Sequence, residues 1–512
     1  MGERLIVQRL EGEYWWGGDI EDGIRMPFGE ERHTRDLIRE GRSNQAVPFL
    51  VSSLGRYIWS EEPFRFEFDP DELVVECEAG SSARLGEGHG SLREAYRAAS
   101  HAHFAPDGRW PDPMFFAAPQ YNLWIELQYE PTQEKVLAYA EAALRNGMPP
   151  GILMIDDNWM EDYGVWTFRK DRFPDPKAMC AKLREMGFKV MLWICPFVSP
   201  DNAANFRFLE RQGYLLRNAT GETAVRRWWN GYSAVLDCTN EAAVRWFDGE
   251  LERLMTAYGV DGFKFDAGDP QYYRADDRSA AGAHPNGHCE AWARVGLRYA
   301  LNEYRACWKS AGRPLVQRLA DKNHSWGADG LASLIPNGLA QGLAGYAFVC
   351  PDMIGGGQIA DVENRPDRQV DQELFVRYAQ CSALFPMMQF SAAPWRALDD
   401  EHLAACVAAA DLHRSFGDLI LALARQAAIT GEPIIRHLDY VFPGEGFERL
   451  TDQFMLGDTI LASPVLMKGA RRRKVEFPLG KWLGDDGSVV IGPCVRDIDA
   501  PLTRLPWYRL IG

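Results

Sequence analysis

The chain has 512 residues, of which 46% are apolar and 25% are charged, a mixture typical of a globular protein with room for two or three domains. The net charge of −16 argues against nucleic acid or an anionic membrane surface as a partner. No apolar run approaches the ~18 residues that a membrane-spanning helix needs.

The N-terminal segment lacks the apolar core of a signal peptide. The ten cysteines are scattered without a Cys-x-x-Cys pair, and some, such as Cys195 and Cys350, lie in apolar runs typical of strands. These features predict a cytoplasmic protein with reduced, buried thiols.

Short segments with alternating apolar and polar residues fill the first hundred positions, and turn residues separate them. This pattern is typical of antiparallel strands, and it predicts a short N-terminal β-sandwich over residues 1–100. The clearest segments are residues 4–9, 46–53, 64–68 and 72–78.

From about residue 118, apolar strand-like runs alternate with amphipathic helices. This alternation predicts a parallel sheet, and eight such units close a (β/α)8 TIM barrel of about 250 residues or more. We expect an α/β fold with this barrel over residues 101–430. The expected strands include 121–127, 152–155, 189–195 and 262–265; the expected helices include 134–145, 177–186, 202–211, 242–258 and 403–426.

Short strands with glycine turns return after about residue 433. They predict a small C-terminal β domain over residues 431–512, expected to be a β-sandwich. Its strands are expected at residues 454–456, 460–466, 474–477 and 488–491.

Acidic residues stand at the ends of several predicted barrel strands. Because the carboxyl ends of barrel strands meet at one rim, these acids are expected in a single cleft. A carboxylate at the end of a buried strand is costly unless the protein uses it, although Asp266 alone could equally cap the next helix. The residues are Asp156, Asp157, Asp266, Asp321 and Asp352.

The residue types at this rim limit the chemistry. There is no Gly-x-Ser-x-Gly motif, and carboxylates without histidine pairs are poor metal cages, so we expect no metal and no cofactor. Two-carboxylate chemistry at an acetal carbon remains, in which one acid attacks or activates water and the other protonates the leaving oxygen. The 17 Trp, 18 Tyr and 26 Phe residues agree with a sugar-binding cleft but could equally fill the core.

Several motifs resemble glycoside hydrolase family 31, the retaining α-glycosidases. Lys264-Phe-Asp-Ala-Gly268 is similar to the family's nucleophile motif, and Asp352-Met-Ile-Gly-Gly356 is similar to its Asp-Ile-Gly-Gly. The order and spacing of further motifs also match over nearly the whole chain. These include Ile155-Asp-Asp-Asn-Trp159, Trp228-Trp-Asn-Gly231 and Asp452-Gln-Phe-Met-Leu-Gly457.

The resemblance implies roles for individual residues in an exo-acting, retaining hydrolase. Asp266 matches the nucleophile, and Asp321, five residues before Trp326, matches the general acid/base. Arg305 matches an arginine that clamps sugar hydroxyls. Such a mechanism needs Asp266 ionised, with Arg305 favouring that state, and needs Asp321 in a setting that keeps it protonated at rest.

The same resemblance implies substrate contacts. Asp156 and Asp352 match acids that bind hydroxyls or support the site from behind, and Trp193, which could instead be barrel core, matches an aromatic residue of the first subsite. The full set of expected substrate-binding residues is Asp156, Asp157, Trp193, Trp228, Trp229, Lys264, Arg305, Trp326, Asp352, Trp124, Glu126, Gln389 and Ser391.

Departures from the family pattern bear on the sugar. Gln389 and Ser391 replace the usual Arg-x-His, and Arg318 replaces the Trp that usually stands three residues before the acid/base. These changes resemble a divergent branch with an animal α-galactosidase. However, Leu127 replaces a Tyr of that branch, and Glu126 is expected to reach a sugar hydroxyl instead.

We therefore expect a small oligosaccharide or glycoside as substrate, with an α-galactoside slightly favoured over an α-glucoside. An α-xyloside or α-N-acetylgalactosaminide stays open, as does homo-oligomer formation. A non-catalytic sugar-binding protein on the same fold is the alternative from another class.

Overall fold

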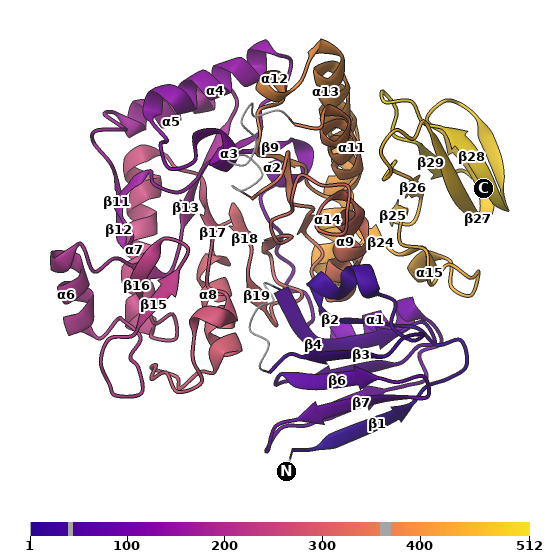
Figure 1. The fold of residues 1–512 in the computed structure, drawn as a ribbon, viewed down its shortest axis with the longest axis horizontal. Coiled ribbons are helices and arrows are strands. Elements are labelled where there is room, and N and C mark those ends of the chain that lie inside the picture. The colour runs from indigo at the N-terminus through magenta and orange to yellow at the C-terminus, as the bar shows by residue number, and fades with distance from the viewer. Residues whose placement is uncertain (1, 39–44, 359–369) are drawn as a thin grey trace.

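The computed structural model describes residues 2–38, 45–358 and 370–512, and Figure 1 shows an N-terminal sheet-rich part, a barrel and a C-terminal sheet. Two antiparallel sheets form the N-terminal part. The first contains β1 (Arg4–Gln8), β7 (Glu72–Cys77), β6 (Phe64–Phe68) and β3 (His33–Asp36). The second contains β2 (Trp15–Asp19), β4 (Gln45–Ser52), β5 (Tyr57–Ser60) and β8 (Ala83–Gly86).

Aromatic side chains fill the space between these sheets. Phe64, Phe66 and Phe68 alternate along β6 and are all buried, as the period of two in a strand requires. The ring of Phe68 lies 6.4 Å from that of Trp15 on the other sheet. The expected N-terminal β domain is therefore present. A strand that the sequence did not predict, β19 (Cys307–Trp308), leaves the barrel and pairs with β4, which joins the two parts.

Eight parallel strand positions close the barrel, which confirms the predicted (β/α)8 fold. The chain order is β9 (Gln120–Asn122), β10 (Ile152–Ile155), β13 (Lys189–Ile194), β17 (Gly262–Phe265), β18 (Asn302–Tyr304) and β20 (Val316–Arg318). Next, β21 (Val349–Cys350) pairs with β20, and β22 (Met353–Ile354) pairs with β23 (Gln389–Phe390). Only two residues separate β21 from β22, so these two short strands together fill one of the eight positions. The pairing of β23 with β9 then closes the ring.

Helices surround these strands (Figure 1). They include α4 (Gln133–Arg145), α5 (Pro176–Glu185), α6 (Ala203–Gln212), α7 (Glu241–Tyr258), α8 (Pro285–Gly296), α9 (Leu334–Leu343) and α11 (Gln372–Ala383). Helix α7, which precedes strand β17, shows how side chains and glycine set the ends of a helix. The Asn240 side chain accepts from the Ala242 N–H at the start of α7, and Gly259 takes a left-handed φ of 78° at its end.

Two expected elements of the barrel region are divided in the structure. The segment 121–127 is not one strand, because the Asn122 side chain accepts from the Trp124 N–H and turns the chain into a short helix, α3 (Trp124–Leu127). The predicted helix 403–426 breaks at Phe416 into α13 (Asp400–Ser415) and α14 (Gly417–Thr430).

The C-terminal strands form one six-stranded antiparallel sheet, rather than the two sheets expected of a sandwich. Its order is β24 (Ile435–Arg436), β25 (Phe454–Leu456), β26 (Ile460–Ala462), β29 (Trp507–Leu510), β27 (Arg472–Gly484) and β28 (Val489–Asp499). Strand β27 is longer than the expected strand 474–477, because it continues past a register shift between Phe477 and Gly480.

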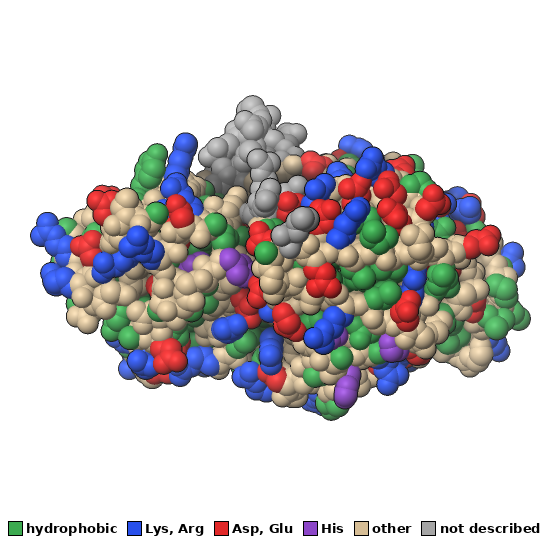
Figure 2. Space-filling view, turned by 90° about the horizontal axis from the view of Figure 1, so that it is seen from below, with side chains coloured by type: hydrophobic (Ala, Val, Ile, Leu, Met, Phe, Trp, Pro, Cys, Tyr) green, Lys and Arg blue, Asp and Glu red, His purple; other side chains and the backbone are tan. Residues whose placement is uncertain are grey.

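All ten cysteines are free, and nine of them are buried. No helix in the described part of the chain combines the length and the apolar character needed to cross a bilayer. On the face shown in Figure 2, acidic and basic side chains are interspersed rather than gathered by sign.

Candidate active site

A cavity of about 280 Å³ lies at the carboxyl ends of the barrel strands. Its wall combines aromatic rings with charged groups of both signs, which is the composition of a pocket for a small polar ligand. The lining residues are Trp124, Tyr129, Asp156, Asp157, Trp193, Trp229, Lys264, Asp266, Arg305, Arg318, Asp321, Met353, Gly357 and Gln358.

Asp266 continues strand β17 into this cavity. Its backbone N–H still donates to the Ile194 carbonyl of β13 at 2.9 Å, so the sheet fixes the residue. The chain then turns sharply, with φ of 56° at Ala267 and 77° at Gly268. A Cβ at Gly268 would stand 2.2 Å from the Trp292 ring, so both the turn and the packing need glycine there.

Three groups hold the Asp266 carboxylate. The Trp193 Nε1–H donates to Oδ2 at 2.7 Å, the Lys264 Nζ lies 3.9 Å from the same oxygen, and the Arg305 Nε lies 3.5 Å from Oδ1. Burial raises the pKa of Asp266, but Lys264, Arg305 and Arg318 together outweigh it and bring the pKa to about 2. Asp266 is therefore ionised at neutral pH, as expected from the sequence.

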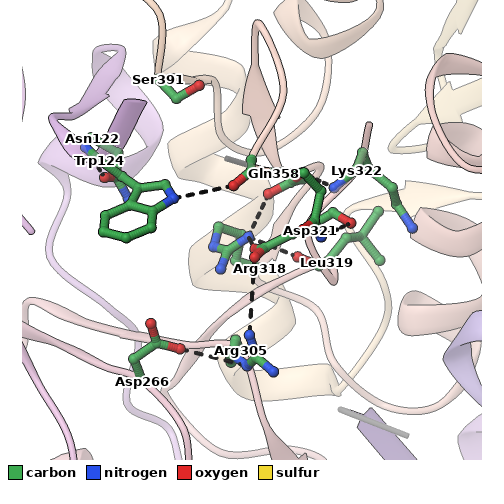
Figure 3. A network of polar contacts seen from close by, with 12 residues as sticks. Asn122, Trp124, Asp266, Arg305, Arg318, Leu319, Asp321, Lys322, Gln358 and Ser391 are labelled. Carbon is green, nitrogen blue, oxygen red and sulfur yellow. Dashed lines mark hydrogen bonds and ion pairs between the residues drawn. The ribbon is translucent and has the colours of Figure 1, made fainter. Parts of the chain in front are cut away.

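Asp321 faces Asp266 across the Arg305 guanidinium. Arg305 Nη1 lies 4.0 Å from Asp321 Oδ2, so one cation lies within 4.0 Å of both carboxylates (Figure 3). The Asp321 side chain is 23% exposed, which leaves it open to the cavity. The two acids that lie 55 positions apart in the sequence thus meet at one site.

The surroundings of Asp321 differ from the expectation. Burial raises its pKa, but Arg318, at 2.8 Å from Oδ1, and Arg305 outweigh burial and lower it. The expected setting that keeps Asp321 protonated is therefore not found among these neighbours, because two guanidinium groups stabilise the carboxylate.

Arg318, at the end of β20, contacts more than Asp321. Its Nη1 also donates to Asp352 Oδ1, and its Nε lies 3.4 Å from Glu303 Oε1 on β18. Arg318, Glu303 and Asp352 are all fully or almost fully buried. Burial raises the pKa of Asp352 to about 7 despite Arg318.

Asp156 and Asp157 end β10 with different partners. Asp156 accepts a hydrogen bond from the Lys264 Nζ at 2.8 Å. Asp157 accepts from Asn230 Nδ2 at 2.7 Å and from the Tyr163 hydroxyl at 3.1 Å. Burial and the neighbouring Asp156 raise the pKa of Asp157 to about 7.

Some of the tryptophans predicted to contact substrate line the cavity, while Trp228 lies in the core. Trp124, Trp193 and Trp229 line the cavity, and Trp229 is 41% exposed with Arg305 stacked 5.1 Å from its ring. Trp228 is buried, stacks on Phe197 at 4.2 Å and lies outside the lining, so its contact with substrate stays a prediction that the cavity wall does not support.

Five other predicted contact residues also lie outside the lining. Both Glu126 oxygens accept from Arg396, with Nε to Oε2 at 2.8 Å, and Glu126 lies outside the lining, so its contact with a sugar hydroxyl stays a prediction. Asp352 is fully buried on Arg318, which agrees with the supporting role. Trp326 donates to Asp371 at 3.1 Å.

The remaining two predicted contact residues, Gln389 and Ser391, stand where the family usually has Arg-x-His. Gln389 lies in the barrel interior, where its amide donates to Glu303 at 2.6 Å and to Gln120 at 2.8 Å. The Ser391 hydroxyl donates to the Gly356 carbonyl at 2.5 Å and holds the loop after β22. Neither side chain belongs to the cavity lining.

Sequence reasoning missed several residues of the site. Arg318 stood out as a departure from the family pattern, and a charge at the end of a buried strand was the signal that could have identified it. Tyr129, Gly357 and Gln358 line the cavity from loops and Met353 from the two-residue strand β22, where neither periodicity nor charge marks them. Among the described residues, no group of three or more His, Cys, Asp or Glu side chains is arranged to hold a metal ion.

Comparisons with known proteins agree with this geometry. The model of the "Glycosyl hydrolases family 31 TIM-barrel domain" matches residues 115–415, and the model of the family's C-terminal domain matches residues 431–509. The myogenesis-regulating glycosidase of Mus musculus is 36% identical over 398 residues, which is 76% of this chain and 55% of that protein. Alpha-glucosidase 2 of Bacillus thermoamyloliquefaciens is 25% identical over 78% of this chain and 53% of its own length.

The fold has counterparts among solved structures. The GH31 dextranase of Flavobacterium johnsoniae, complexed with glucose, superposes with a TM-score of 0.87 at 21% identity, covering 99% of this chain and 66% of that one. The chain thus spans about half the length of the two curated relatives named above. The barrel model covers more than half of the chain, and the match to the mouse protein covers three quarters of it. The chain therefore belongs to glycosyl hydrolases family 31.

Proposed function

We propose that the chain is a retaining, exo-acting α-glycoside hydrolase with Asp266 as nucleophile and Asp321 as general acid/base. The observation that carries this proposal is the placement of both carboxylates on the Arg305 guanidinium, inside one small cavity at the carboxyl rim of the barrel. A pair of carboxylates at this position is the machinery that glycoside hydrolysis requires.

In the first step, an Asp266 oxygen attacks the anomeric carbon and forms a glycosyl ester. The bond to the leaving oxygen breaks, and Asp321 gives that oxygen its proton. The low pKa of Asp266 keeps this carboxylate ready to attack, and the Trp193 N–H orients it. In the second step Asp321 takes a proton from water, which opens the ester and restores the α configuration.

The size of the cavity supports exo action. About 280 Å³ is near the lower end of the ~300–1,000 Å³ range of small-molecule sites, which suits a single sugar ring. Trp193 and Lys264, both buried, would form its inner end, while Trp229 would form the exposed mouth where the leaving group departs.

The sugar is an α-linked hexose, with an α-galactoside favoured slightly over an α-glucoside. Support comes from the departures at Gln389, Ser391 and Arg318, which resemble the divergent branch with an animal α-galactosidase. The Asp156–Lys264 pair presents an acceptor and a donor together, so it is suited to bind neighbouring hydroxyls. An α-xyloside or an α-N-acetylgalactosaminide is the next candidate.

Two further points of the sequence prediction are part of this proposal. We infer domain boundaries near residues 100 and 430, so that the three units are 1–100, 101–430 and 431–512. We also infer a reducing compartment, the cytoplasm, because all ten cysteines are free.

A panel of aryl α-glycosides tests the reaction. The galactoside, glucoside, xyloside and N-acetylgalactosaminide would be assayed with the wild type and with Asp266→Asn. We expect turnover of at least one glycoside, loss of that turnover in the variant, and an α-anomeric product by NMR. Full turnover by Asp266→Asn, or a β-anomeric product, would contradict the proposal. Binding of sugars without any turnover would instead indicate a sugar-binding protein.

A further inference from the structure

The Nη1 atom of Arg318 faces more acceptors than it has hydrogens. It carries two hydrogens, yet three oxygens accept from it: Asp321 Oδ1 at 2.8 Å and the Leu319 carbonyl at 3.1 Å, both labelled in Figure 3, and Asp352 Oδ1. Two of these acceptors are carboxylates. A third carboxylate, Glu303, lies 3.4 Å from Nε of the same guanidinium.

The charges are equally unbalanced. Arg318 faces three carboxylates, Arg305 adds a second cation at Asp321 alone, 4.0 Å from Oδ2, and Glu303 and Asp352 are almost inaccessible to water. Burying unpaired charges is strongly unfavourable, so a proton held by this group of acids is favoured. A proton on either carboxyl at Nη1 would also relieve the shortage of donors.

The backbone fixes Asp352 in this arrangement. Its φ is 75°, a left-handed value that costs free energy for a residue other than glycine. The Lys322 N–H donates to Asp352 Oδ2 at 2.6 Å, and the hydroxyl of Ser391 holds the loop that follows. Asp352 therefore stays on Arg318 but does not reach the cavity.

We propose that Asp352 is a positioning residue for the acid/base: it competes with Asp321 for Arg318, so that the two carboxyls share one proton, which reaches the glycosidic oxygen through Asp321. This inference rests on the proposed function. The proton moves from the Asp321 carboxyl to the leaving oxygen as the glycosidic bond breaks, and water returns it to Asp321 when the ester opens. Asp352 thus offsets the carboxylate-stabilising effect of the two arginines.

Other ionisable groups also face the pair. Burial raises the pKa of Tyr378 and of Cys350 well above their usual values, so both stay neutral. The remaining groups are the same in the wild type and in the Asp352 variant, so a difference between these two proteins isolates Asp352. They are Lys264, Arg305, Lys322, Asp266, Glu303 and Glu21.

The pH profile of kcat/KM gives the first test, on a glycoside that the wild type hydrolyses. In Asp352→Asn, Asp321 is the one carboxylate left on Arg318 Nη1, so the alkaline limb is expected to move down by about one pH unit. Activity on a poor leaving group should fall more than activity on a good one, because only the former needs the acid. An unshifted or raised limb would overturn the proposal.

The variant Arg318→Met should shift the pH profile in the opposite direction. Without the cation, the alkaline limb should move up by about one pH unit. If this variant does not fold, the double variant with Asp352→Asn removes both charges together, and its limb should lie above that of Asp352→Asn alone. Asp439→Asn is the matched control, since Asp439 is also a buried acid, lies in the C-terminal part and should leave the limb unchanged.

Thermal unfolding tests the shared proton without any activity. The pKa of Asp352 is about 7 in the folded chain, against about 3.9 when unfolded. A raised pKa stabilises the fold at low pH, and this contribution is lost as pH rises through 7. Relative to Asp352→Asn, the wild type should thus lose about 2 °C or more in its unfolding midpoint between pH 5 and 8.

The activity assays and the unfolding midpoint distinguish a failure of the proposed hydrolysis from a failure of proton sharing. A difference in unfolding midpoint that does not change with pH overturns proton sharing, whatever the activity. If no glycoside is turned over but the midpoint difference changes with pH as described, the proposed hydrolysis fails and the shared proton stands.

Discussion

On the β17 side of the cavity, Asp266 has two cations and an indole N–H within reach, whereas on the β20 side Asp321 shares one guanidinium with two further carboxyls. Both carboxyls belong to one buried cluster, and both lie near Arg305. The difference in their other partners would prepare the two acids for the two roles proposed above. Two cations and an indole N–H favour an ionised Asp266, whereas the further carboxyls on Arg318 favour a proton in the group that contains Asp321.

Removing the nucleophile tests the first half of this comparison and should have the largest effect. Asp266→Asn keeps the shape but cannot form the ester, so turnover should fall by about 10⁴-fold or more. Steady-state assays on an aryl α-glycoside measure this loss. Asp439→Asn removes a buried acid elsewhere and should retain turnover; a comparable loss in that control would trace the effect to folding.

Removing the acid tests the other half. Asp321→Asn should lower kcat/KM by about 10²–10⁴-fold for a sugar leaving group, and much less for an activated aryl group that departs without a proton. The comparison of the two leaving groups in the same variant is the measurement. Equal losses on both would mean that Asp321 does not act as the acid.

The indole N–H on Asp266 contributes less. Trp193→Phe keeps the ring but removes the hydrogen bond of 2.7 Å, and a bond to a charged acceptor is worth about 1.5–3 kcal/mol. A fall of about 10-fold or more in kcat/KM is expected. Tyr163→Phe is a useful comparison, because it also removes one donor, but from Asp157 instead of Asp266. A wild-type kcat/KM in Trp193→Phe would show that the indole N–H on Asp266 does not contribute to catalysis.

The neighbouring tryptophans should behave in opposite ways. Trp229→Ala at the exposed mouth should raise KM several-fold with little change in stability. Trp228→Ala empties a buried site and should lower the free energy of unfolding by about 3–5 kcal/mol. Chemical denaturation and steady-state kinetics distinguish these results, and a large KM effect in a stable Trp228→Ala protein would place that ring at the substrate after all.

The smallest effect concerns acid pH. Because the pKa of Asp266 is about 2, below the value near 3.9 of an unfolded chain, its charge is lost only as pH falls through 2. Labelling of Asp266 by an activated fluoro-sugar, which needs no acid, should therefore stay nearly constant from pH 6 to 4. A fall centred near pH 5 would show that Lys264 and Arg305 do not control this group.

Much of the barrel could be predicted because its strands are buried on both faces and form continuous apolar runs, as in β10 and β13. The short strands β22 and β23, of two residues each, carry no such pattern. The turn at Asn122 was missed because it depends on one side-chain hydrogen bond, which the apolar run around it conceals.

The residues of the site also divide into those that the sequence could place and those that it could not. Asp266, Asp321 and Arg305 could be placed by motif spacing, and the structure brings them together. Glu126 and Gln389 lie outside the lining on Arg396 and Glu303, which are 270 and 86 positions away, and no local pattern reveals such contacts.

Trapping of the glycosyl ester tests the central claim most directly. The protein would be incubated with mechanism-based fluoro-sugars of several configurations, digested and mapped by mass spectrometry. The account predicts one added sugar on the peptide that contains Asp266, absent from Asp266→Asn and retained in Asp439→Asn. A label on Asp321 or on another residue, or no label with any sugar that the enzyme turns over, would contradict it.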